Sequence, residues 1–396
     1  MKILSITAQK PSSTGSGVYL GELLHSWEAA GHSQAVVYGC THADPQPDFP
    51  GVTCCPVFYE SAAMPFPVLG MSDEMPYPST RYRDLNELQL QQFSDAFHQA
   101  VTAAVELENP DWIVCHHLYL LTALVRRWFP SRRIVGISHG SDLRQFGKNP
   151  KFRELILSEI PKLDRIIALH ASQQAEICRV FGCDGDRVRV IGAGYNQKIF
   201  RPSGLPRSEG PVRISFAGKI TAKKGIFSLL RALDRIPGDR LTVRLAGGFS
   251  NPEEEARIRA LAMQNRHSIE FPGMLSHPAL AQLLQNSDLF VLPSFFEGLP
   301  LVTMEAMACG CRVVCSDLPG LRPGFDAHIP GHTVSFVPMP AMRQVDEPEA
   351  DQLPAFESRL AEAIEAGLRM PVPAQPDLSG VSWDGVSRRI LHFLSE

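Results

Sequence analysis

The feature that most constrains the fold is an alternation of short β-rich runs with longer helical patterns, which occurs twice along the 396 residues. Parallel strands need a crossover connection, usually a helix, so the alternation predicts β/α/β units with right-handed crossovers. In the first half, strands are expected at 2–7, 34–38, 111–115, 134–138, 164–169 and 187–191. In the second half, they are expected at 212–217, 241–246, 268–271, 288–292 and 312–315.

Two such patterns predict two doubly wound α/β domains, at about 1–200 and 201–380. They are joined by 192–211, which is rich in Gly, Pro and Ser. The acidic, Pro-rich segment 337–355 is expected to be a surface connection, and the amphipathic stretch 383–395 a final helix. Open sheets of this kind bind ligands outside the carboxyl ends of their strands, so functional residues are expected in the loops there.

Composition excludes several classes of protein. Lys and Arg number 38 against 42 Asp and Glu, whereas a nucleic-acid-binding protein usually has a basic excess. No apolar run reaches the roughly 18 residues of a membrane span, and the N-terminal segment is typical of a buried strand rather than a secretion signal. The nine cysteines are odd in number and irregularly spaced, which favours reduced thiols. A cytoplasmic, soluble enzyme is therefore expected.

The first loop carries Gly15-Ser16-Gly17, after an expected strand and at the start of a helix. Glycine lets the backbone approach a ligand, and a helix N-terminus favours an anion. A dinucleotide-binding motif would also need an acidic residue about 20 positions later. The chain has Gly39, Cys40 and Thr41 there, which argues against a dehydrogenase. A phosphate-binding loop and a tight turn without a ligand both remain open.

The strongest signal is the segment 293–310, PSFFEGLPLVTMEAMACG. Glu297 follows an expected strand, Pro300 suits the first position of a helix, and Glu305 lies about one turn into it. The free N–H groups of a helix start suit a diphosphate, and carboxylates accept hydrogen bonds from sugar hydroxyls. The pattern therefore indicates a nucleotide-linked sugar. Acids that only stabilise a helix start would explain Glu297, but not a glutamate inside an apolar helix.

A third element is FAGKITAKKG at 216–225. Lys219 directly follows an expected strand, and Lys224 precedes Gly225 at the start of a helix. Two cations at the carboxyl end of a strand would neutralise a leaving diphosphate. The alternative is a solvated, lysine-rich surface loop.

Together these elements resemble the family 4 glycosyltransferases (retaining, GT-B type, glycosyl transferases group 1). The family's pattern of a basic residue, Lys-Gly and Glu-x7-Glu is matched by Lys219, Lys224-Gly225 and Glu297 with Glu305. The glycine loop, ISHGSD at 137–142 and VIGAGYNQKIFRP at 190–202 match in place and order. The resemblance spans residues 1 to about 320. It implies two Rossmann-like domains facing an inter-domain cleft, with 381–396 returning to the first domain.

The resemblance also implies roles for individual residues. The donor-binding residues would be Gly17, Lys219, Lys224, Glu297, Gly298, Leu299 and Glu305. Lys219 and Lys224 would hold the diphosphate, Glu305 the ribose and Glu297 the sugar hydroxyls, while the other three would contribute backbone amides. His139 matches the family histidine beside the anomeric centre. The expected catalytic residues are therefore His139, Lys224 and Glu297.

The implied activity is transfer of a sugar from a nucleotide sugar, expected to be a UDP-sugar, with retention at the anomeric carbon. The acceptor would be a hydroxyl of a small molecule, a glycan or a lipid-linked sugar. No cofactor and no metal are expected, because lysines replace the metal. Two alternatives remain: a nucleotide-sugar 2-epimerase of the same fold, and a non-catalytic nucleotide-sugar-binding protein.

The sequence offers little support for a metal site. His116 and His117 are adjacent on an expected strand, so their side chains should point to opposite faces. Cys309, Cys311 and Cys315 lack a C-x-x-C pair and a fourth ligand.

Two segments suggest contacts with other molecules. The Pro-rich segment 60–83 is expected to be an extended loop, and its Tyr77, Arg81 and Tyr82 would suit an anionic or sugar-like acceptor. These side chains could instead pack the loop onto its own domain. The basic run 126–165 suggests either peripheral membrane contact or a solvated surface.

Overall fold

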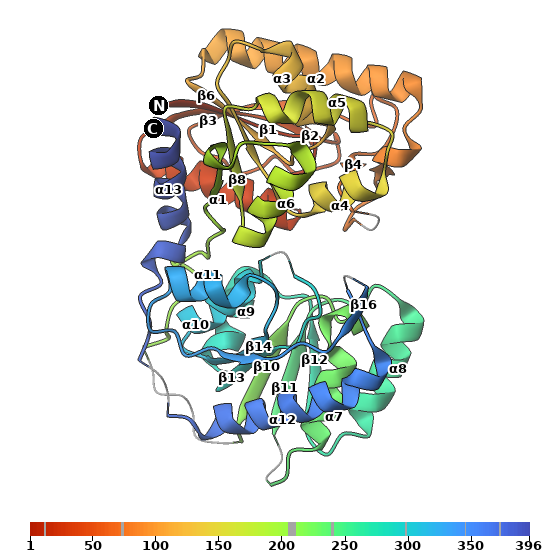
Figure 1. The fold of residues 1–396 in the computed structure, drawn as a ribbon, viewed down its shortest axis with the longest axis vertical. Helices are drawn as coiled ribbons and strands as arrows, with labels where there is room; N and C mark the ends of the chain where they lie inside the picture. The colour runs from red at the N-terminus through yellow and green to blue at the C-terminus, as the bar shows by residue number, and fades with distance from the viewer. Residues whose placement is uncertain are drawn as a thin grey trace. The chain divides into compact units, whose positions relative to one another are not determined.

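The computed structural model describes residues 1–11, 13–72, 75–204, 211–238, 241–297, 299–344, 346–371 and 374–396. The chain divides into two compact units (Figure 1). Unit one comprises Met1–Ala193 and Trp383–Glu396, and unit two comprises Gly194–Ser382. Each unit is built on a parallel sheet. None of the helices in the described ranges is long and apolar enough to cross a membrane.

Unit one contains a parallel sheet in the order β3-β2-β1-β6-β7-β8-β9. Its strands are β1 (Lys2–Thr7), β2 (Ser33–Cys40), β3 (Val52–Phe58), β6 (Trp112–His116), β7 (Ile134–Ile137), β8 (Arg165–Ala168) and β9 (Val188–Val190). The central strands are almost wholly buried, because helices cover both faces of a parallel sheet. The strand order reverses at β1, which pairs with β2 on one side and β6 on the other.

Seven α-helices are described in unit one, and some of them begin at polar capping side chains. They are α1 (Gly15–Ala29), α2 (Glu87–Glu108), α3 (Leu120–Trp128), α4 (Ser141–Lys148), α5 (Arg153–Glu159), α6 (Ala171–Phe181) and α13 (Trp383–Ser395). The Thr14 side chain caps α1, and Asn86 and Gln89 form a capping box at the start of α2. The last helix, α13, packs against α1 and so belongs to unit one.

Unit two has a parallel sheet in the order β12-β11-β10-β13-β14-β15. Its strands are β10 (Arg213–Ala217), β11 (Thr242–Ala246), β12 (Ser268–Gly273), β13 (Leu289–Leu292), β14 (Arg312–Ser316) and β15 (Ser335–Val337). Its helices are α7 (Ile226–Asp234), α8 (Pro252–Met263), α9 (His277–Gln285), α10 (Leu301–Ala308), α11 (Leu321–His328) and α12 (Leu353–Arg369). The order reverses between β10 and β13, which are directly paired.

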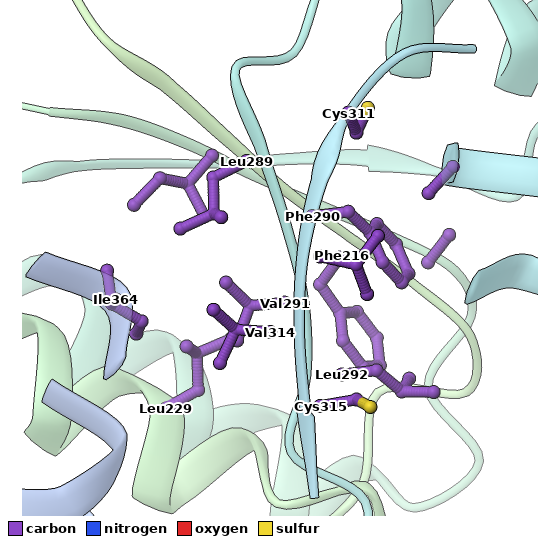
Figure 2. Close-up of a cluster of buried hydrophobic side chains, with 14 of the residues drawn as sticks. Phe216, Leu229, Leu289, Phe290, Val291, Leu292, Cys311, Val314, Cys315 and Ile364 are labelled. Carbon is purple, nitrogen blue, oxygen red and sulfur yellow. The ribbon is translucent and has the colours of Figure 1, made fainter. Parts of the chain in front are cut away.

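The core of unit two is organised by β13, the strand between β10 and β14 (Figure 2). Successive side chains of a strand point to opposite faces. Figure 2 shows Leu289 and Val291 on the side of Leu229 of α7 and Ile364 of α12, with Phe290 on the other side. Both faces of the strand are therefore packed, as a doubly wound sheet requires.

The expected α/β class with two doubly wound, Rossmann-like sheets is confirmed. Two strands of the parallel sheets were not predicted from the sequence, β3 and β15. β3 contains Pro56, which argues against a central strand. Since β3 lies at the edge of its sheet, Pro56 is tolerated there. The segment 337–355 is also more regular than expected, because β16 (Met342–Gln344) and β17 (Glu347–Pro348) pair within it.

Replacement of Phe290 by alanine should destabilise unit two by about 3–5 kcal/mol, because it leaves a cavity around a fully buried strand. Met263→Ala is the control: its side chain is 88% exposed, so the change should be within about 0.5 kcal/mol. Urea unfolding followed by circular dichroism measures both. All four tryptophans lie in unit one, so their fluorescence should report an unchanged transition there. Equal losses in the two variants would contradict the prediction.

Candidate functional site

In unit two, the predicted donor-binding residues gather where the strand order reverses. Lys219 and Lys224 follow β10, and Glu297 follows β13, the strand paired with β10. Both loops leave the carboxyl ends of their strands, where open α/β sheets bind ligands. Two segments about 70 residues apart in sequence are thereby brought together.

Lys224 and Glu297 form an ion pair that is neither fully buried nor fully exposed. The Nζ atom of Lys224 lies 2.7 Å from Oε2 of Glu297, with side-chain exposures of 23% and 17%. The buried Ser294 hydroxyl donates to the other carboxylate oxygen, Oε1, at 2.7 Å. The carboxylate is thus held on one side by a cation and on the other by a hydroxyl, which fixes its orientation.

Gly225 allows the two loops to approach this closely. Its φ is +69°, and an added Cβ would lie 2.0 Å from the carbonyl oxygen of Pro293. The same contact continues as a hydrogen bond from Phe295 N–H to the Lys223 carbonyl at 3.0 Å. A glycine after Lys224 is therefore required both by backbone conformation and by space.

The remaining predicted donor residues occupy the surroundings of the pair. Lys219 is exposed and makes no ion pair or hydrogen bond within the described residues. Leu299 and Glu305 are half-buried, and Glu305 is the fifth residue of α10. Pro300 is the residue before the helix rather than its first, and within the described residues no side chain caps the helix start. Gly298 lies outside the described residues.

In unit one, His139 lies at the centre of an aromatic cluster at the carboxyl ends of β6 and β7. Its Nε2 is 3.0 Å from Nδ1 of His116, the last residue of β6. The rings of His117 and Tyr19 lie 4.8 Å and 5.2 Å from its ring centroid. The Tyr19 hydroxyl donates to the Gly192 carbonyl at 3.0 Å, which fixes that ring.

The expectation that His116 and His117 point to opposite faces was wrong, because both rings contact His139. The strand ends at His116, and His117 adopts a left-handed backbone conformation with φ of 71°. The strict alternation of a strand therefore no longer holds at His117. Its Nε2 lies 3.2 Å from Oε1 of Gln9, which follows β1.

Asp142 holds the backbone around the histidines. Its fully buried carboxylate accepts from the amides of Leu118 and His139 at 2.9 and 3.2 Å, and from the Ser138 hydroxyl at 3.0 Å. A carboxylate with several donors is a strong local anchor. Asp142 therefore ties the loop after β6 to the loop after β7.

All three histidines are neutral at pH 7. Burial lowers the pKa of His116 to about 3 and the pKa of His117 to about 4. Burial, and then the neighbouring His117 and His116, hold the pKa of His139 well below its ordinary value. The cluster can therefore orient a neutral imidazole, but it does not present a cation at pH 7.

Gly17 is engaged locally. Its backbone N–H donates to the Thr14 hydroxyl at 3.2 Å and caps α1. A phosphate at Gly17 would have to share or replace this bond. The role expected for Gly17 stays a prediction.

The three predicted acceptor residues have different surroundings. Tyr82 is 2% exposed and packs on Tyr119, which favours the packing alternative for this residue. Arg81 is exposed and pairs with Asp84 at 2.6 Å. Tyr77 is half-buried, with the Lys10 ammonium 4.9 Å from its ring centroid.

Charges in the basic run 126–165 are partly used inside unit one. Arg126 pairs with Asp164 at 3.0 Å, and Glu159 pairs with both Arg127 and Lys162. Within the described ranges, no group of three His, Cys, Asp or Glu side chains could hold a metal ion. Contact with a membrane stays a prediction.

Several residues that support the site had no predicted role. They are Gln9, Tyr19, His116, His117, Asp142 and Ser294. Asp142 belongs to the segment ISHGSD, and the pair of histidines was visible as a doublet. Gln9, Tyr19 and Ser294 carry no signal in sequence spacing.

Gly225→Ala should destabilise unit two by at least about 3 kcal/mol, because a left-handed conformation and a backbone clash add together. Gly331→Ala is the matched control, since Gly331 has φ of +76° and nothing within 4 Å of an added Cβ. It should cost only about 1–2 kcal/mol. Urea unfolding followed by circular dichroism measures both. Equal losses would show that the contact with Pro293 is unimportant.

The stability of unit one should fall as the pH falls below about 6.5. The unfolded chain, with ordinary histidine pKa values, then binds protons that the folded histidines do not. Each buried histidine contributes a slope of up to about 1.4 kcal/mol per pH unit between its folded and unfolded pKa. Tryptophan fluorescence during urea unfolding at several pH values measures it. His117→Gln should flatten the slope, and an unchanged slope would contradict the prediction.

Two family models match the chain. The model for Glycosyltransferase Family 4 matches residues 13–198, and the model for Glycosyl transferases group 1 matches residues 197–334. Alpha-maltose-1-phosphate synthase of Mycobacterium tuberculosis is 29% identical over 226 residues, 53% of this chain and 55% of that protein. D-inositol 3-phosphate glycosyltransferase of Mycobacterium bovis is 31% identical over 265 residues, 61% of this chain and 54% of that protein. The chain spans about half the length of these relatives.

Solved structures share the fold along the whole chain. Sucrose-phosphate synthase of Thermosynechococcus elongatus has a TM-score of 0.67 and 20% identity, and covers 100% of this chain and 98% of its own. Anabaena HepE, solved with UDP and glucose, has a TM-score of 0.65 and 15% identity, and covers 100% and 99%. These likenesses identify the fold as GT-B. Since the two family models together extend from residue 13 to residue 334, the chain belongs to the group 1, family 4 glycosyltransferases.

Proposed function

We propose that the chain transfers a glycosyl group from a nucleotide sugar to a hydroxyl acceptor, with retention of anomeric configuration. The observation that carries the proposal is the Lys224–Glu297 pair, held at the strand-order reversal of unit two beside a helix start that no side chain caps. A diphosphate needs positive charge and N–H donors, and a sugar needs fixed acceptors for its hydroxyls. The loops after β10 and β13 offer both.

The positive charge of unit two suits the leaving group. As the bond from the anomeric carbon to the phosphate oxygen breaks, negative charge develops on the diphosphate. Lys224 and the exposed Lys219 stabilise that charge together with the amides at the start of α10. The two lysines provide the charge that a divalent metal supplies in other enzymes, so the proposed reaction needs no metal.

The carboxylates suit the rest of the donor. Glu297 is oriented by Ser294 and Lys224, and its remaining lone pairs accept from hydroxyls of the transferred sugar. Glu305, one turn into α10, binds the ribose. The Lys224–Glu297 ion pair weakens when the ammonium of Lys224 binds the diphosphate.

The neutral state of His139 suits the carbon centre. The anomeric carbon gains positive charge as the diphosphate leaves, and an imidazolium beside it would be repelled. A neutral His139 instead hydrogen bonds to the sugar and keeps it in place. The acceptor hydroxyl attacks from the face that the diphosphate leaves, and its proton passes to the departing phosphate oxygen.

A UDP-sugar is the proposed donor. HepE, which shares the fold at 15% identity, was solved with UDP and glucose. The acceptor is a hydroxyl compound whose identity the proposal leaves open. Thermal-shift measurements with a panel of UDP-, GDP- and ADP-sugars test the donor, because a ligand that binds the native state raises the melting temperature.

Lys224→Ala should lower turnover by roughly 100-fold or more, on the scale of losing one electrostatic stabiliser of the transition state. Lys223→Ala is the matched control, because the neighbouring lysine pairs with Asp346 at 2.7 Å rather than with Glu297. It should leave turnover nearly unchanged. Steady-state kinetics measures the turnover of both variants, with an acceptor mixture and the nucleotide sugar that raises the melting temperature. Equal turnover in the two variants would reject the assignment of Lys224.

Proton NMR of the products tests the reaction class. Retention predicts that the new glycosidic bond has the same anomeric configuration as the donor. Donor incubated without an acceptor should remain intact or hydrolyse slowly. Appearance of an epimerised sugar in that sample would identify an epimerase instead, and binding without any turnover would identify a non-catalytic binding protein.

A further inference from the structure

A second imidazole lies directly against His139. The Nδ1 atom of His116 is 3.0 Å from Nε2 of His139, and the two rings are nearly parallel, with an interplanar angle of 9°. This is the distance of a hydrogen bond between two ring nitrogens. One of the two nitrogens that His139 can offer is therefore occupied inside the protein.

The two partners differ in how firmly they are held. His116 is 3% exposed, is the last residue of β6, and pairs with Ile137 of β7 in the sheet. His139 is half-buried and lies in the loop beyond β7. The sheet thus fixes the position of His116, and the hydrogen bond from His116 restricts the orientation of the His139 ring.

The surroundings also indicate which nitrogen carries the hydrogen. Both rings are neutral at pH 7, so the bond between them contains a single hydrogen. The Nε2 atom of His116 is buried and has no hydrogen-bond partner in the described part of the chain. An orphaned N–H group is rarer in proteins than an orphaned acceptor, so this nitrogen is best left without a hydrogen. His116 then donates from Nδ1, and His139 accepts at Nε2.

The hydrogen of His139 is consequently on Nδ1. Within the described residues this nitrogen makes no hydrogen bond, and it is not fully buried. It is therefore accessible. An accessible N–H on a ring of fixed orientation can donate to a sugar hydroxyl.

We propose that His116 is a positioning residue for the transfer reaction: it holds His139 by a hydrogen bond to Nε2 and so directs the Nδ1–H of His139 toward the donor sugar. The inference rests on the proposed function for the role of His139, but the hydrogen bond and the tautomer are properties of unit one alone. His116 itself does not contact the substrate in this proposal.

Kinetics with paired variants tests the positioning role. His116→Phe keeps a ring of similar size but removes the hydrogen bond, and should lower kcat by roughly 10- to 100-fold with little change in donor KM. His116→Asn places an amide donor near the position of Nδ1 and should recover most of that loss. His98→Phe is the matched control: this exposed histidine stacks on Trp128, away from the cluster, and its loss should leave kcat unchanged.

A double variant separates positioning from a merely structural role. If His116 acts through His139, His116→Phe should cause almost no further loss when added to His139→Ala. A further loss of the same size as in the wild-type background would overturn the proposal. So would a His116→Asn protein no more active than His116→Phe.

Nitrogen-15 NMR of histidine-labelled protein provides a readout that does not need turnover. In the wild type, His139 should be protonated on Nδ1. His116→Phe should shift His139 toward the Nε2-protonated form. The melting temperature of the variant, measured in parallel, shows whether it is folded. A wild-type His139 protonated on Nε2 would overturn the proposal, whether or not the protein is a transferase. Conversely, if no donor is turned over but the tautomer is as expected, the proposed function fails and the hydrogen bond stands.

Discussion

The candidate site depends on one property of parallel sheets, the reversal of strand order at paired strands. In unit two, β10 and β13 are paired, and the chain runs outward from them in opposite directions along the sheet. The connections after these two strands therefore diverge, and the carboxyl ends stay open to other groups. Lys224 and Glu297 meet there because of this geometry. In unit one the same reversal, at β1 and β6, brings Gln9 against His117.

The two units differ in the electrostatic character of what they place at these ends. Unit two presents two lysines, a helix start and a carboxylate held in a fixed orientation, all partly open to solvent. Unit one presents three histidines that are neutral at pH 7, because burial lowers their pKa values. In the proposed transfer reaction, a diphosphate gains negative charge and a carbon gains positive charge. Cations stabilise the first, and an uncharged ring can lie beside the second without repulsion.

Much of the fold was predictable because helices and strands have different hydrophobic periods, and alternating them leaves few topologies. The expected strands at 2–7 and 241–246 correspond closely to β1 and β11. The prediction failed at β3, where Pro56 is unfavourable in a central strand but harmless at an edge. Whether a strand lies at an edge is decided by the order of the whole sheet, which local sequence does not contain.

The sequence by itself determined the residues whose chemistry requires a fixed spacing: Lys224 before Gly225, and Glu297 before a helix that carries Glu305. Those spacings are local, so each segment carries its own signal. Only the tertiary structure decided how the segments meet, since Lys224 and Glu297 lie about 70 residues apart and form an ion pair at 2.7 Å. It also decided that His116 and His139, 23 residues apart, share a hydrogen bond. Neighbouring strands of a parallel sheet are separated in sequence by a whole crossover, so contacts between their ends appear only when the sheet has formed.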